Sequence, residues 1–104
     1  MVKVIIGYKV RGGTDVQPLL VQLRSHAATF PGLVACENLV SRQDPSILTM
    51  IQTWKSLDGW AAFQESRIAR SLFEKAKPLL DGDPRVTIYD QMPTMSWDSS
   101  VRNS

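Results

Sequence analysis

The side chains that could do chemistry in this chain are few, and most of them are aromatic. Among 104 residues there is one histidine, His26, which falls between the apolar positions Leu23 and Phe30 of a predicted helix. An imidazole can exchange a proton near neutral pH and so act as a base toward a phenol. A lone helical histidine is also common at the edge of a core without any catalytic role. Both interpretations of His26 stay open at this point.

A second group of candidates lies in the aromatic-rich segment from Ile47 to Phe63. The pattern predicts a strand that reaches Trp54, then a helix that Ser56 caps and that carries Trp60 and Phe63. Large aromatic residues either fill a core or form the flat walls of a pocket. The hydroxyls of tyrosines on the outer strands can donate hydrogen bonds into such a pocket, although tyrosine is also an ordinary strand residue.

Composition and charge exclude several classes of function. One cysteine, Cys36, and one histidine cannot form an internal disulfide or a His/Cys metal cluster within one chain. The net charge is +2 with scattered basic residues, so we expect no nucleic-acid partner. No apolar run approaches the roughly 20 residues of a membrane span, and we expect no membrane partner. Because Met1 leads directly into a strand pattern, we expect a cytoplasmic protein.

Hydrophobic periodicity and turn residues predict seven elements. A Thr14–Gln17 capping box begins the first helix, and Ser66 begins a new helical segment or a kink after the second. The elements are a strand over Val2–Val10, a helix from Thr14 to about Phe30, strands over Leu33–Ser41 and Ile47–Lys55, two helical segments after Ser56 and Ser66, and a strand over Arg85–Met92.

The order β-α-β-β-α-α-β predicts an α+β fold of two layers. We expect a ferredoxin-like four-stranded antiparallel sheet with helices on one face, formed by one domain over residues 1–92, and a C-terminal tail over residues 93–104. The strand from Ile47 carries apolar residues on both faces. A sheet with helices on only one side then leaves an apolar face uncovered, so we expect a homodimer that packs sheet against sheet.

The chain resembles the antibiotic biosynthesis monooxygenase (ABM) domain, a dimeric α+β barrel, from about Val2 to Met92. The resemblance rests on the Pro31-Gly32 turn, the Thr53-Trp54-Lys55-Ser56 strand end, the aromatic at Trp60 and the last strand with Tyr89. It implies a cofactor-independent monooxygenase of an electron-rich phenol or quinol, without a metal or organic cofactor. The haem-degrading branch is not expected, because Phe73 stands where that branch has its axial histidine.

The resemblance also implies a site between the sheet and the helices. Trp54 matches a tryptophan whose indole N–H holds a substrate oxygen, whereas Met50 stands where the family has an asparagine and Trp60 where it has a tyrosine. We therefore predict Trp54 and His26 as catalytic. The predicted substrate-binding residues are Met50, Trp60, Phe63, Tyr8 and Phe73.

Two other functions remain open from the sequence. The first is a non-catalytic module that binds a small apolar or aromatic molecule or only forms a dimer, and Met50 favours it because a methionine makes that part of the cavity less polar. The second is an isomerase-like or signal-degrading enzyme with the same fold.

Overall fold

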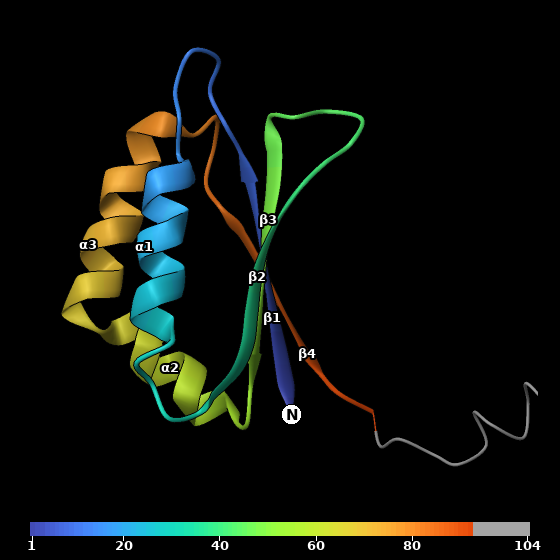
Figure 1. The fold of residues 1–104 in the computed structure, drawn as a ribbon, viewed down its shortest axis with the longest axis vertical. Coiled ribbons are helices and arrows are strands. Elements are labelled where there is room, and N and C mark those ends of the chain that lie inside the picture. Colours follow the sequence, from blue (N-terminus) through green and yellow to red (C-terminus); the bar gives the residue numbers. More distant parts are fainter. Residues whose placement is uncertain (93–104) are drawn as a thin grey trace, which may run out of the picture.

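A computed structural model describes residues 1–92, so the tail predicted over residues 93–104 lies outside the described part. Four antiparallel strands form one sheet in the order β2-β3-β1-β4, and the helices lie together on one side of it (Figure 1). The elements are β1 (Val2–Lys9), α1 (Gln17–Ala27), β2 (Leu33–Val40), β3 (Ile47–Trp54), α2 (Leu57–Glu65), α3 (Arg67–Ala76), the short 3₁₀ helix η1 (Lys77–Leu79) and β4 (Arg85–Asp90). The predicted α+β order and the single helical layer are confirmed.

The strand register aligns side chains in rows across the face that the helices cover. One row, which we call the Met50 row, runs from Val86 on β4 through Ile6 and Met50 to Asn38 on β2. Because side chains of a strand alternate between the two faces, the next row on this face lies two residues away. We call it the Gln52 row, and its members are Ile88, Val4, Gln52 and Cys36.

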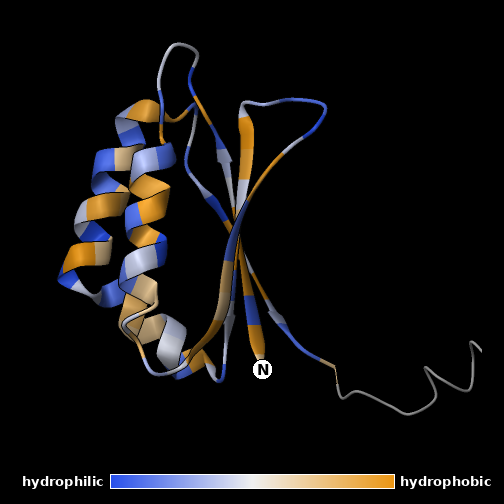
Figure 2. Cartoon of the chain, in the orientation of Figure 1, coloured by the Kyte–Doolittle hydropathy of each residue, from blue (hydrophilic) through white to orange (hydrophobic). Residues whose placement is uncertain are grey.

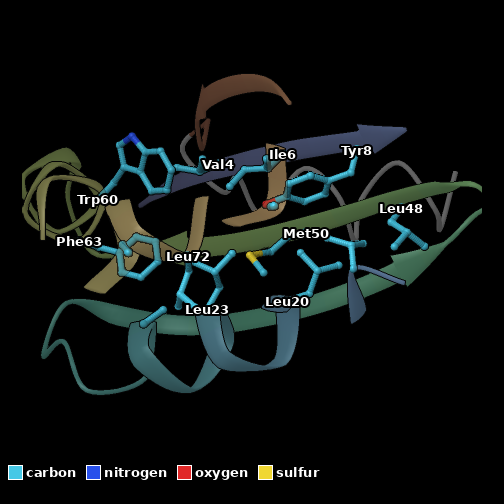
Figure 3. Packing of buried hydrophobic residues seen from close by; sticks show 14 of the residues in the cluster. Val4, Ile6, Tyr8, Leu20, Leu23, Leu48, Met50, Trp60, Phe63 and Leu72 are labelled. Carbon is cyan, nitrogen blue, oxygen red and sulfur yellow. The ribbon is translucent and has the colours of Figure 1, made fainter. Parts of the chain in front are cut away.

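The core lies between the middle strands and the helices. Apolar and polar residues alternate along α1 and α3 (Figure 2), and the apolar ones of α1 that become buried are Leu20, Leu23 and Ala27. Figure 3 shows Leu20 and Leu23 next to Met50 of the sheet, and all belong to one buried cluster with Ile6. The helices do not cover the β4 edge, where Val86 and Ile88 remain 48% and 45% exposed. This uncovered edge leaves apolar surface next to the helical layer.

Two of the predicted helix caps are wrong. The helix predicted from Thr14 begins only at Gln17, and the Thr14 hydroxyl lies within hydrogen-bonding distance of the carbonyl oxygens of Arg11 and Leu79 instead. The Gln17 amide that the capping box would have bonded to Thr14 donates to Oδ1 of Asp15 at 3.0 Å. Ser56 precedes α2, but its side chain caps no backbone amide.

Two other expectations about the helices have clear outcomes. Ser66 begins α3 as predicted, and its hydroxyl accepts a hydrogen bond from the amide of Ala69. Helix α1 ends at Ala27, three residues before the predicted end at Phe30. None of the helices within residues 1–92 is long and apolar enough to cross a membrane.

Candidate functional site

Phe63 of α2 is the centre of an aromatic cluster beneath the helices. Its ring centroid lies 5.8 Å from that of Trp54, 5.9 Å from Trp60 and 6.5 Å from Phe73. Phe63 also lies 5.7 Å from both His26 in α1 and Phe30, which follows that helix. The fold therefore brings five of the predicted site residues together, with Phe63 as the ring that all the others approach.

Trp54 is completely buried, and its ring lies directly against backbone. A Cβ atom built on Gly59 would lie 2.7 Å from Cε3 of this ring, and one on Gly32 would lie 3.6 Å from the same atom. The two glycines, one in the predicted turn before β2 and one in the first turn of α2, thus allow the indole to fit between these segments. The Trp54 Nε1–H donates to Oε1 of Gln52 at 2.9 Å, so the indole donor is already occupied.

Gln52 is the buried polar side chain that sequence reasoning missed. It is fully buried beside Met50 and Trp54 on the same face of β3, and its Nε2 donates to the Met50 sulfur at 3.2 Å. Burial raises the pKa of the Cys36 thiol in the adjacent strand, while the positive charge of Arg24 and the neighbouring Gln52 amide partly oppose that effect. In the sequence, this residue could have been noticed as the one amide among the alternate, otherwise apolar residues of the strand, which are Leu48, Met50, Gln52 and Trp54.

His26 is half-buried and makes a defined contact with the start of α3. Its Nε2 lies 3.0 Å from the Ser66 hydroxyl, whose one proton is donated to the carbonyl oxygen of Phe63 at 2.6 Å. His26 Nε2 must therefore donate this hydrogen bond, since a hydroxyl has only one proton. This leaves Nδ1, and not Nε2, as the nitrogen that can accept a proton while the contact is kept.

Tyr8 lies in the core beside Met50 and has an unusual environment. It is 2% exposed, and its hydroxyl is the one buried side-chain N or O atom within residues 1–92 that has no hydrogen-bond partner. Burial raises the pKa of Tyr8 strongly, with a smaller contribution from Cys36, so the phenol is protonated at neutral pH. It is a hydrogen-bond donor, not a base.

Two grooves open at opposite edges of the helix-covered face. The first, which we call the β4 groove, has a volume of about 230 Å³ and is lined by Trp60, Gln64, Phe73, Lys77, Pro84 and Val86. The second, the β2 groove, has a volume of about 240 Å³, and its lining includes Leu20, Val21, Asn38 and Val40. Since Val86 and Asn38 are the two ends of the Met50 row, the grooves are separated by the buried side chains of Ile6 and Met50.

The β4 groove offers aromatic walls and little polar chemistry. Lys77 is its only titratable side chain, and its Nζ donates to Oε1 of Glu74 at 3.0 Å, which raises the pKa of Lys77. The described residues contain no group of three or more His, Cys, Asp or Glu side chains placed to hold a metal ion. The groove can therefore bind a flat apolar ring, while a proton acceptor would have to come from elsewhere.

The structure places the predicted site residues in three positions. Trp60 and Phe73 line the β4 groove, whereas Trp54, Phe63 and His26 belong to the aromatic cluster without lining the groove. Met50 and Tyr8 lie in the core between the two grooves. Their catalytic and binding roles stay predictions.

Comparison with known proteins assigns the fold. No family model and no curated protein matches the chain. A crystal structure described as an antibiotic biosynthesis monooxygenase matches with a TM-score of 0.82 and 21% identity, over 89% of this chain and 100% of the other. A conserved protein from Methanosarcina mazei matches with a TM-score of 0.83 and 19% identity, over 88% and 92%.

A third match has a described activity. SnoaB from Streptomyces nogalater, described as a cofactor-independent oxygenase, has a TM-score of 0.79 and 14% identity, over 91% of this chain and 96% of SnoaB. Such identities establish a common fold and nothing finer. The resemblance to the ABM fold that the sequence predicts is confirmed at that level.

Proposed function

We propose that this protein is a cofactor-independent monooxygenase that binds an electron-rich phenol or quinol in the β4 groove. The observation that carries the proposal is the aromatic-walled groove of about 230 Å³ between the helices and β4. The fold supports it, because SnoaB, a cofactor-independent oxygenase, has the same arrangement of strands and helices. A flat aromatic molecule suits walls formed by Trp60 and Phe73.

The proposed reaction needs little from the protein. A deprotonated phenol can itself reduce dioxygen. In the balanced reaction, a phenol with a free para C–H and one O₂ give a quinone and one water. The new C=O bond replaces the C–H bond, the second oxygen atom leaves as water, and the substrate supplies all the electrons. A dry apolar groove and one or two hydrogen-bond donors then favour the reaction by excluding water and stabilising the developing charge.

Within this proposal, Trp54 and His26 act from behind the groove. Neither residue lines the groove, and each contacts Phe63, which in turn contacts the groove residues Trp60 and Phe73, so a substrate would reach them by displacing the Phe63 ring. His26 then offers Nδ1 as a base, because Nε2 donates to Ser66.

The second candidate is a binding module without catalysis. It is favoured by the hydrogen bond that occupies the Trp54 indole N–H and by the Glu74 partner of Lys77. Both groups are donors already bonded within the protein, and the lining of the β4 groove contains no carboxylate or imidazole that could act as a base. A ligand would then bind on apolar contact alone.

We also propose a cytoplasmic homodimer. The sheet face without helices carries the paired residues Ile5 and Ile51 at its centre, with Ile47, Leu39 and Tyr89 exposed around them. A second copy is the simplest cover for this face. Light scattering at micromolar concentration should give twice the chain mass, and Ile51→Lys should lower it to a monomer. A Val21→Lys control on the helical side should stay dimeric, and a monomeric wild type would refute the dimer.

Oxygen uptake distinguishes the two candidate functions. Purified protein is tested with naphthoquinols, anthrones and catechols beside the variants Trp60→Leu, Phe73→Leu and Trp54→Phe. The matched control is Val21→Ala, which alters the β2 groove only. We expect uptake above the rate without enzyme that falls in the Trp60 and Phe73 variants and not in the control.

The other outcomes are equally definite. Binding of these compounds without uptake supports the binding module. Turnover without oxygen uptake points to an isomerase-like enzyme, and a loss in the Val21 control would move the site to the β2 groove.

A further inference from the structure

We propose that Tyr8 Oη and Gln52 Nε2 form a pair of hydrogen-bond donors for the oxygen atom of the ligand, and that the Met50 side chain fills this position in the unliganded protein. The inference rests on the proposed function in taking a phenolate or quinone carbonyl as the ligand. It extends that function by assigning the donors and a movable plug to residues outside the groove lining.

The Gln52 amide carries the first part of the argument. Its oxygen accepts a full hydrogen bond from Trp54 Nε1, whereas its Nε2 is paired only with the Met50 sulfur. Sulfur is a weak acceptor, so a fully buried amide nitrogen is left with poor partners. An oxygen atom that reaches Nε2 would accept a much stronger hydrogen bond than the Met50 sulfur does.

The Tyr8 hydroxyl carries the second part independently. A buried hydroxyl without a partner is costly, and such groups in proteins call for a functional or structural reason. Figure 3 shows the Tyr8 ring directed along β1 toward Ile6 and Met50, and Ile6 is the residue that pairs with Met50 across the strands. The hydroxyl is also close enough to Cys36, the residue that pairs with Gln52 across β2 and β3, for a charge there to affect it. Both poorly satisfied donors therefore border Met50.

Met50 is well suited to be displaced. Its side chain is fully buried and unbranched, and a methionine can change rotamer without a backbone shift. The Met50 row leads to the β4 groove through Ile6 and Val86, and to the β2 groove through Asn38. A ligand that advances from a groove along this row meets the donors when Met50 swings away.

The donors fit an oxygen that gains negative charge. Burial keeps the Tyr8 phenol protonated, and an amide N–H has no competing ionisation. Two neutral donors in a dry interior stabilise an oxyanion more strongly than they stabilise the neutral phenol. Binding should therefore favour the phenolate over the phenol.

The test uses 4-nitrophenol as the probe, because its absorbance reports its ionisation directly. Bound to the wild type, the probe should ionise at a lower pH than in buffer. Tyr8→Phe and Gln52→Leu should each weaken phenolate binding about tenfold and return the ionisation toward its free value. Tyr89→Phe is the matched control, because that tyrosine is 55% exposed on the other face of the sheet. Wild type that fails to bind the probe, or variants that bind it like wild type, overturn the donor pair.

Thermal unfolding without ligand provides a second arm that does not depend on the substrate. If the Tyr8 hydroxyl is kept for a ligand, Tyr8→Phe should unfold at the same or a higher temperature than wild type. A clear decrease would overturn the proposal, since the hydroxyl would then have a structural partner. This arm also keeps the test decisive if Gln52→Leu fails to fold after Trp54 loses its acceptor.

Oxygen uptake separates this inference from the proposed function. Probe binding that depends on both residues, without uptake on any phenol, supports the donor pair and refutes oxygenation. Uptake that is unchanged in Tyr8→Phe and Gln52→Leu refutes the donor pair and leaves the oxygenase proposal standing.

Discussion

Gly59→Ala tests whether the buried Trp54 ring, and not helix propensity, decides what α2 tolerates. Gly59 lies inside α2, where alanine in place of glycine ordinarily stabilises a helix by about 1 kcal/mol. At this position the new methyl group would lie 2.7 Å from Cε3 and 3.3 Å from Cζ3 of Trp54. Overpacking of that kind typically costs about 1–3 kcal/mol, since neither a buried ring nor a helix backbone yields easily.

The packing cost should exceed the gain in helix propensity. We expect a net loss of about 1 kcal/mol in the free energy of unfolding, which for a domain of this size lowers the melting temperature by about 4–8 °C. Urea titration followed by circular dichroism, with thermal unfolding beside it, measures both quantities.

A second background gives the sharper comparison. Trp54→Phe removes the outer ring atoms that the new methyl group would meet, so Gly59→Ala should be neutral or stabilising in that background. The coupling between the two substitutions is the measured result. A Gly59→Ala protein that is more stable than wild type would refute the placement of Trp54 against α2.

Three further outcomes follow from other contacts. Ser66→Ala should lower the free energy of unfolding by about 1 kcal/mol, because the Ser66 hydroxyl caps α3. Ser56→Ala should lower it by under about 0.5 kcal/mol, because Ser56 caps no amide, and equal losses in urea unfolding would contradict this assignment. Hydrogen bonds from Ser46 and Lys9 lower the pKa of Asp44 to about 2, so its contribution to stability is present above about pH 4 and is lost as the pH falls through about 2. The melting temperature of Asp44→Asn should therefore be below that of wild type at pH 6 and equal to it at pH 2. A difference in melting temperature that persists at pH 2 would refute this. Cys36 should react with iodoacetamide more slowly in the folded protein at pH 8 than in urea, because burial raises the pKa of its thiol. Equal alkylation rates of the folded and unfolded protein, measured by mass spectrometry, would contradict its burial.

The kind and order of the elements could be predicted from the sequence because their signals are local. Alternation of apolar residues along β1 and helical spacing in α1 depend only on neighbours in the chain. The same signals failed where a distant contact competed. Thr14 has the right spacing for a cap, but its hydroxyl lies near the carbonyl oxygen of Leu79, 65 residues away.

The candidate site could be predicted only in part. Aromatic residues after β3 pointed to a cluster, and Phe63 does join Trp54, Trp60, Phe73 and His26. Gln52 was missed, since one amide in a strand gives no sign of whether water or a tryptophan satisfies it. The unpartnered hydroxyl of Tyr8 is likewise visible only when every neighbour is placed.

The sequence by itself determined the α+β order, the single helical layer and the presence of only one histidine and one cysteine, because periodicity and composition are properties of the chain. Only the tertiary structure decided which rings meet at Phe63 and that the Trp54 indole is bonded to Gln52. It also decided that the helices leave the β4 edge open beside Trp60 and Phe73. These features depend on how three helices cover four strands, and a hydrogen-bond partner or a groove exists only once segments distant in the chain have packed together.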